Sequence, residues 1–261
     1  MVVLDDVVLM REGQTVFSHL SCTLAMDERV VLLGGSGAGK TTFLRLVLGL
    51  VHPDSGRVLV DGADLAAISD DELRQLRLRF GLVFQEGALF DSLTVGDNVA
   101  FYLREQAHLP EAEVQDRTNE MLARVGLIHA KDLMPEELSG GMQRRAAIAR
   151  SMVAQEPEML LYDEPTSDLD PYNAEVICRL IIDLTAHGRG FLVVTHEIFH
   201  ALSLGQRFLF LNQGKLEFDG TREELIKSDN PHLRRFVGEL YWEAVKCMPD
   251  LFSLEPGAKN P

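Results

Sequence analysis

One stretch of this sequence, residues 34–42, limits the possible folds more than any other. It follows the apolar run 29–33 and precedes the mostly apolar segment 43–48, so a buried strand, a loop and a helix start are consecutive. The pattern G-x-x-x-x-G-K-[ST] is complete in it, at Gly34, Gly39, Lys40 and Thr41. Glycines let such a loop fold back so that its N–H groups face phosphate oxygens, and the helix start adds a partial positive charge. The stretch predicts a nucleotide phosphate site rather than a plain glycine-rich turn.

The expected phosphate-binding residues follow from that pattern. They are Gly35, Ser36, Gly37, Ala38, Gly39, Lys40, Thr41 and Thr42. In such a loop the lysine reaches the β- and γ-phosphates, and the hydroxyl that follows it is a ligand of Mg²⁺. Thr41 is therefore a candidate metal ligand.

The order of the remaining elements predicts an α/β fold. Apolar strands at 80–84, 159–163 and 190–195 alternate with helical segments such as 70–78. Such alternation gives a parallel sheet covered on both faces, to which we add an expected antiparallel β edge. Asp170 and Pro171 predict the capped start of another helix.

A block between two of these strands is helical throughout. The segments 94–105 and 111–125 have helical periodicity, and a third helix is expected after Ser139. We therefore predict an α-helical subdomain inserted into a nucleotide-binding core. The expected division is a 1–240 domain, with core 1–84 and 158–240 and helical subdomain 85–157, followed by a C-terminal extension 241–261.

Charge and composition narrow the function. The net charge of −15 argues against a general nucleic-acid or anionic-membrane binder. Three widely spaced cysteines without a C-x-x-C pair argue against a disulfide framework and fit a reducing cytosol. The N-terminal residues lack a basic signal-peptide region, and we find no apolar run near the roughly 18 residues of a membrane span. If the protein serves a membrane, another chain is expected to cross it.

Asp163 and Glu164 end a fully apolar strand, where parallel-sheet proteins place their ligands. Neighbouring residues in extended chain point in opposite directions, so the two carboxylates can have different roles. We expect Asp163 in the Mg²⁺ shell and Glu164 as the general base that polarises the attacking water. The simpler alternative is two acids that begin a loop.

The segment 138–145, Leu-Ser-Gly-Gly-Met-Gln-Arg-Arg, predicts a second anion site. Two glycines in the first turn of a helix cost about 1 kcal/mol each relative to alanine. Gly140 and Gly141 make sense where an anion approaches that backbone, with Ser139 as N-cap and extra donor. The alternative is a flexible helix entry.

Taken together, these motifs resemble those of an ABC-transporter ATPase. The resemblance covers residues 1–240 and rests on the loop 34–42, Gln85, the signature 138–142, the strand ending at Asp163–Glu164, the D-loop 167–170 and His196. It implies hydrolysis of ATP with Mg²⁺ in a RecA-like phosphate-loop core.

The same resemblance implies roles for further residues. The implied catalytic residues are Glu164, His196, Gln85 and Lys40, and the implied metal ligands are Thr41, Gln85 and Asp163. His196 would contact the γ-phosphate. Ser139, Gly140 and Gly141 would bind nucleotide across a head-to-tail homodimer that holds two ATP molecules.

The segments 84–100 and 137–145 resemble in particular the ATPases of Mla-type phospholipid transporters. That likeness implies a place on the cytoplasmic face of a bacterial inner membrane, with a multi-pass permease, an MCE-domain lipid-binding protein and a small regulatory protein as partners, and no nucleic acid. Residues 88–90 would meet the permease, unless they pack internally. The alternatives are an ABC ATPase for small-solute import or cell division, or an ATP-gated regulator with little turnover.

Three features fit these expectations less well. Arg11 occupies the place where the family usually has an aromatic residue stacked on adenine, and an arginine plane can also stack on a base. Asp168 stands where a small D-loop residue is usual, and its effect stays open. The run 196–200 matches the zinc pattern H-E-x-x-H, but His196 follows a strand and no third ligand is evident, so we expect His200 to be an ordinary helix-surface residue.

Overall fold

The computed structural model describes residues 1–85, 87–106, 109–153, 157–185 and 188–238. Within these ranges the strands are β1 (Val2–Arg11), β2 (Gln14–Leu24), β3 (Arg29–Leu33), β4 (Ser55–Val60), β5 (Ala63–Asp64), β6 (Phe80–Val83), β7 (Met159–Asp163), β8 (Gly190–Thr195), β9 (Arg207–Asn212) and β10 (Lys215–Thr221). Apolar residues at helical spacing from Leu233 to Met248 predict a last helix, of which only the part up to residue 238 lies within the described residues.

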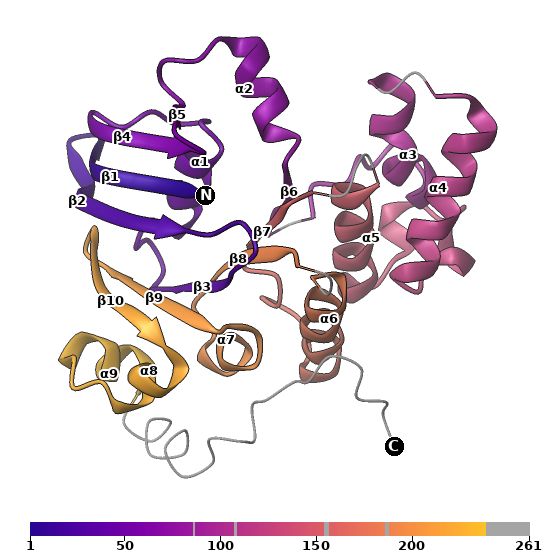
Figure 1. The fold of residues 1–261 in the computed structure, drawn as a ribbon. Helices are drawn as coiled ribbons and strands as arrows, with labels where there is room; N and C mark the ends of the chain where they lie inside the picture. The colour runs from indigo at the N-terminus through magenta and orange to yellow at the C-terminus, as the bar shows by residue number, and fades with distance from the viewer. Residues whose placement is uncertain (86, 107–108, 154–156, 186–187, 239–261) are drawn as a thin grey trace.

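The helices of the described ranges cover both faces of the main sheet (Figure 1). They are α1 (Lys40–Val47), α2 (Asp70–Arg77), α3 (Val95–Glu105), α4 (Glu111–Arg124), α5 (Gly140–Met152), α6 (Pro171–Leu184), α7 (Ile198–Leu204), α8 (Arg222–Lys227), α9 (Pro231–Val237) and the short 3-10 helices η1 (Ile128–Ala130) and η2 (Pro135–Glu137). None of these helices has the length and apolar character that crossing a bilayer requires.

The described strands form two sheets. A six-stranded sheet has the order β10-β9-β3-β8-β7-β6, in which only the β9–β10 pair at the edge is antiparallel. A separate antiparallel sheet has the order β2-β1-β4-β5. The predicted parallel core with an antiparallel β edge is confirmed.

Alternation along the central strand divides the core in two. In β3, Val31 and Leu33 pack into one apolar cluster with helices α3 to α9, while Val30 and Leu32 pack into another with α1 and the antiparallel sheet. All four side chains are fully buried, as expected for a parallel strand covered on both faces. This order leaves the carboxyl ends of β3, β7 and β8 side by side at one edge of the sheet.

The N-terminal strands differ from the expected pattern. The apolar segments 2–4 and 7–10 belong to one continuous strand, β1, whose pairing with β2 shifts register between Leu4 and Val7. Asp6 takes a left-handed backbone conformation there, with φ of 52°. A β-bulge places an extra residue in one strand and so accounts for the break in alternation.

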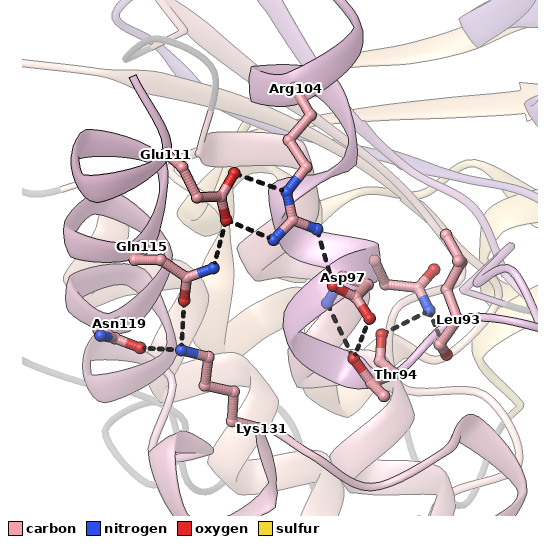
Figure 2. A network of polar contacts seen from close by, with 9 residues as sticks. Leu93, Thr94, Asp97, Arg104, Glu111, Gln115, Asn119 and Lys131 are labelled. Carbon is pink, nitrogen blue, oxygen red and sulfur yellow. Dashed lines mark hydrogen bonds and ion pairs between the residues drawn. The ribbon is translucent and has the colours of Figure 1, made fainter. Parts of the chain in front are cut away.

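The helical region between β6 and β7 is tied together by polar contacts (Figure 2). The Arg104 guanidinium donates to Asp97 on α3 at 2.7 Å and to Glu111 on α4 at 2.8 Å. Lys131 extends this network by donating to Gln115 and Asn119 of α4. The network crosslinks α3, α4 and the segment after η1.

Asn98, which is fully buried, anchors the loop before α3. Its side-chain amide accepts from Phe90 N at 2.7 Å and donates to the carbonyls of Phe90, Leu93 and Thr94 at 3.0 Å each. One side chain therefore satisfies four backbone groups and fixes the segment 90–94.

Candidate active site

The glycine loop joins the end of β3 to the start of α1. Gly37 and Gly39 have positive φ values of 77° and 99°. A Cβ on Gly39 would lie 3.0 Å from the Phe17 ring, and one on Gly34 would lie 2.7 Å from the Leu211 carbonyl oxygen. Both the backbone conformation and the close packing therefore require glycine in this loop.

A cavity of about 470 Å³ opens at this loop. Its lining residues are Val16, Ser36, Gly37, Gly39, Lys40, Thr41, Thr42, Gln85, Glu164 and His196. The structure thus brings together segments from the ends of β3, β6, β7 and β8. Gly35 and Ala38 belong to the same loop but do not line the cavity.

Lys40 is held inside the cavity by three oxygen atoms. Its Nζ donates to the carbonyls of Gly34 at 2.9 Å and Gly35 at 3.1 Å. It also lies 3.1 Å from Oε1 of Glu164, and the two side chains are only 8% and 9% exposed. This is a buried ion pair between the loop lysine and the predicted general base.

Glu164 also contacts His196 across the neighbouring strand ends. Its carboxylate accepts from the His196 backbone N–H at 3.2 Å and lies 3.0 Å from His196 Nδ1. Burial alone would raise the pKa of Glu164, but the hydrogen bond from His196 and the charge of Lys40 bring it below its usual value. Glu164 is therefore ionised at neutral pH, as a general base must be.

The backbone of Glu164 is itself unusual. Its φ of 48° is in the left-handed region, which a non-glycine residue occupies at a cost of about 1–2 kcal/mol. Ser167 stabilises the turn because its backbone N–H and its hydroxyl both donate to the Glu164 carbonyl. Such conformations occur where the surroundings fix them, and they cluster at functional sites.

Asp163 differs from its neighbour. It is 4% exposed, and among the described residues its buried Oδ1 has no hydrogen-bond partner. Burial raises the pKa of Asp163, while a hydrogen bond from Thr41 partly offsets that rise. A buried carboxylate oxygen without a partner beside a hydroxyl has the donor chemistry of a hard divalent cation site.

The Ser-Gly-Gly segment begins α5 as predicted but does not line the phosphate cavity of its own chain. Ser139 is the N-cap, and its hydroxyl accepts from Met142 N at 3.3 Å. A Cβ on Gly141 would lie 2.5 Å from Oδ1 of Asn173 on α6. Close packing within the chain is therefore one reason for Gly141, beside the predicted approach of an anion.

Arg144 connects the predicted loops in a way that sequence reasoning missed. It is 7% exposed and donates to the carbonyl of Phe84 at 2.9 Å, next to Gln85. With Gln85 and Asp168 it lines a second cavity of about 300 Å³. Burial lowers the pKa of Arg144, and the charge of Asp168 opposes that shift. The sequence signal was only a pair of arginines one turn after the signature.

Arg11 is not brought into the phosphate cavity. It is exposed at the end of β1, and its guanidinium donates to the Met10 carbonyl at 3.0 Å. Val16 of β2 lines the cavity instead. Stacking of Arg11 on a base stays a prediction.

The H-E-x-x-H run does not form the zinc arrangement. His196 precedes α7 and faces Glu164, whereas His200 is on α7 and faces Glu197 and Thr166. Within the described ranges, no cluster of three metal-binding side chains is found. The prediction that His200 is an ordinary surface residue is wrong, because its side chain is about three-quarters buried and hydrogen-bonded to Thr166.

A glycine loop between a parallel strand and a helix, with a buried lysine, two acids and a histidine beside it, defines a phosphate-loop nucleotide hydrolase. The family described as "ABC transporter" matches residues 17–167. The chain belongs to this family, and it is an ATPase that binds ATP.

Curated relatives support the same assignment. The "Intermembrane phospholipid transport system ATP-binding protein MlaF" of Escherichia coli (strain K12) is 39% identical over 89% of this chain and 86% of its own length. The "Probable ribonucleotide transport ATP-binding protein mkl" of Mycobacterium tuberculosis is 40% identical over 85% of this chain. The chain spans 62% of the length of that mycobacterial relative.

Among solved structures, the dimeric post-hydrolysis state of the ATP-binding cassette MJ0796, bound to ADP and Pi, matches with a TM-score of 0.77. It is 33% identical and covers 85% of this chain and 98% of its own.

Proposed function

We propose that this chain is the ATP-hydrolysing subunit of a transporter that moves phospholipid across or between bacterial envelope membranes. The observation that carries the proposal is its 39% identity to MlaF over nearly the whole of both chains. The resemblance of the segments 84–100 and 137–145 to Mla-type ATPases points the same way.

The geometry supports specific roles for the residues around the cavity. Lys40 breaks its ion pair with Glu164 and contacts the β- and γ-phosphates. The loop N–H groups of residues 35–42 bind the other phosphate oxygens. Glu164 then accepts the proton of a water molecule that attacks the γ-phosphorus, and ADP leaves. His196 and Gln85 orient the γ-phosphate and that water. Positioning and charge stabilisation account for most of the catalysis.

Thr41, Asp163 and Gln85 are proposed to hold Mg²⁺. The buried Oδ1 of Asp163, which lacks a partner among the described residues, and the Thr41 hydroxyl beside it fit a hard cation. When bound, Mg²⁺ would neutralise charge that builds up on the phosphate oxygens.

A second copy of the chain completes the proposed site. Ser139, Gly140 and Gly141 do not line the phosphate cavity of their own chain, and Ser139 and Gly140 are exposed, so we propose that this segment binds the γ-phosphate held by another copy. The dimeric structure of MJ0796 bound to ADP and Pi supports a dimer, which we propose to be head-to-tail with two ATP molecules.

The proposed membrane partner is a multi-pass permease that docks near Gln85. Phe84, Phe90 and Phe101 are each about 40% exposed, and the Phe90 and Phe101 rings lie 4.6 Å apart. Leu89 packs against the core instead. Through the permease we propose an MCE-domain protein and a small regulatory protein as further partners, and a location at the cytoplasmic face of the inner membrane.

The predicted domain division belongs to the same proposal. β6 ends at Val83 and β7 begins at Met159, which supports an inserted helical subdomain at 85–157. Residues 231–261 are proposed to pack on a partner subunit or a regulatory protein. Truncation after Leu240 that leaves dimerisation and transport intact would overturn this proposal.

Two experiments test the proposal. A phosphate-release assay should find ATP turnover in the wild type and a loss of about 10²- to 10⁴-fold in Glu164→Gln. Equal, near-zero rates in both would instead support an ATP-gated regulator. Co-purification of the full chain with its membrane partners should recover phospholipid, and Phe90→Asp should lose the permease while its ATPase rate is kept.

Transport of another solute is a second candidate, which the 40% identity to mkl favours. Reconstituted complex that moves a ribonucleotide but no phospholipid would establish this candidate and overturn the first.

A further inference from the structure

Three side chains outside the proposed chemistry form a cluster beside it. Nδ1 of His200 lies 3.0 Å from Oγ1 of Thr166 and pairs with the Glu197 carboxylate. Thr166 Oγ1 also lies 3.4 Å from Oε2 of Glu197. Thr166 is 2% exposed, and the other two side chains are about 70% buried.

The cluster joins the two segments that carry the chemistry. Thr166 follows Glu164 by two residues at the end of β7, and Glu197 follows His196 at the end of β8. The Glu164–His196 contact is one connection between these segments, and the Thr166–Glu197–His200 cluster is a second, parallel one. His200 is the second histidine of the H-E-x-x-H run, and the nucleotide chemistry proposed above does not use it.

The turn after β7 needs such a connection. Glu164 is held in a left-handed backbone conformation, which persists only where neighbouring contacts fix it. Ser167 fixes the turn from within by donating to the Glu164 carbonyl. Thr166 lets the segment after β8 hold this turn from outside, in addition to the Glu164 backbone N–H, which donates to the Val194 carbonyl of β8 at 2.9 Å.

The chemistry of the partners assigns the proton. The Glu197 carboxylate accepts hydrogen bonds, so the His200 nitrogen that faces it is the donor of this contact. That Nδ1–H is shared between the Glu197 carboxylate and the Thr166 hydroxyl.

We propose that His200 is a positioning residue for ATP hydrolysis. It acts through Thr166 and Glu197 to fix Glu164 and His196 relative to each other. The proposal rests on the roles given above to Glu164 and His196. A purely structural role of His200, in stabilising the start of α7, would affect unfolding without a specific effect on turnover.

Two isosteric replacements separate these roles in the purified full chain. Asparagine carries its amide donor at the position of Nδ1, whereas glutamine carries it at the position of Nε2. We expect His200→Asn to keep kcat within about twofold, and His200→Gln and His200→Ala to lose about tenfold, with the KM for ATP changed less than twofold. His232→Gln, which removes a similar contact to Glu217, is the control and should keep the wild-type kcat.

Thr166 supplies an independent test. Thr166→Val should lower kcat to a similar extent, Thr166→Ser should restore it, and the double variant Thr166→Val/His200→Ala should be no slower than either single variant.

Equal rates for His200→Asn and His200→Gln, or additive losses in the double variant, would overturn the proposal. Glu164→Gln in the same assay distinguishes this failure from failure of the proposed roles. If Glu164→Gln keeps wild-type turnover, the roles themselves are wrong.

Discussion

The Nζ of Lys40 lies 3.1 Å from Oε1 of Glu164, and both side chains are more than nine-tenths buried. The residue expected to bind phosphate and the residue expected to activate water are therefore paired with each other. If Lys40 binds phosphate as proposed, nucleotide has to draw it away from Glu164, whose carboxylate then keeps only its contact with His196.

Removal of one member of this pair should cost more than removal of both. Lys40→Met leaves a buried carboxylate without its cation, and we expect the free energy of unfolding to fall by about 3 kcal/mol. The double variant Lys40→Met/Glu164→Gln should recover most of that loss. Urea unfolding without nucleotide measures both, and simple additivity would contradict the pairing.

Glu164→Gln alone should bind ATP more tightly while it hydrolyses ATP slowly. Without the carboxylate, Lys40 has no ion pair to give up before it contacts phosphate. A titration of the variant and the wild type with ATP measures the change. We expect the Kd for ATP to fall about tenfold, which corresponds to about 1.4 kcal/mol no longer spent on breaking the ion pair. Unchanged affinity would show that the pair does not compete with nucleotide.

Asp163 should make the nucleotide-free protein pH-dependent in a defined direction. Burial raises its folded-state pKa above the usual 3.8, so the folded state favours the protonated carboxyl. Burial of the ionised Asp163 carboxylate destabilises the folded state. This destabilisation is absent below pH 3.8, grows as the pH rises, and is complete above the folded-state pKa. The Asp163→Asn variant should therefore become more stable relative to the wild type as the pH rises. Because Asp163 is also a proposed ligand of Mg²⁺, the ATP affinity of this variant should no longer depend on Mg²⁺. Urea unfolding across this range, without nucleotide, is the measurement, and a difference constant with pH would refute the assignment.

Gly141→Ala separates the two reasons for glycine at the start of α5. The new Cβ would clash with Asn173, so both stability and ATPase activity should fall. Adding Asn173→Ala should restore the melting temperature. If the backbone at residue 141 also has to approach phosphate, activity stays low in the double variant. Recovery of both would leave packing as the sole reason.

Asn98 and Arg104 should differ strongly in their contribution to stability. Asn98→Ala leaves the Phe90 N–H and the Leu93 carbonyl without their side-chain partner, whereas the Phe90 and Thr94 carbonyls keep backbone donors, and we expect a loss of about 3 kcal/mol. Arg104→Ala removes part-exposed ion pairs and should cost about 1 kcal/mol or less. Chemical denaturation compares them, and hydrogen exchange should locate the Asn98 effect at Phe90.

The sequence predicted most strands and helices that combine an apolar pattern with a capping or turn residue. Asp170 caps α6 as expected, and Thr221 forms the capping box of α8. The hairpin of β9 and β10 was missed, although the turn Gln213–Gly214 has the left-handed φ values of a two-residue hairpin loop. A Gln-Gly turn is a weaker sequence signal than Asn-Gly.

Only the parts of the candidate site that are encoded in short, continuous stretches of sequence could be predicted. The loop 34–42 and the strand ends at Asp163 and His196 carry their own signals. The Lys40–Glu164 pair and the contact of Thr166 with His200 depend on strand order, which brings together segments far apart in the chain. No periodicity or spacing encodes those distances, so they appear only once the sheet is assembled.

Arg144 also has a mechanical consequence. Its side chain extends from α5 to the carbonyl of Phe84, the residue before Gln85. The helical region is therefore hydrogen-bonded to the core next to the residue proposed to orient the catalytic water. A rotation of α5 relative to the core would therefore pivot at the hydrogen bond between Arg144 and the Phe84 carbonyl. Motion imposed on the helices by a membrane partner would then reach Gln85 within one side-chain length.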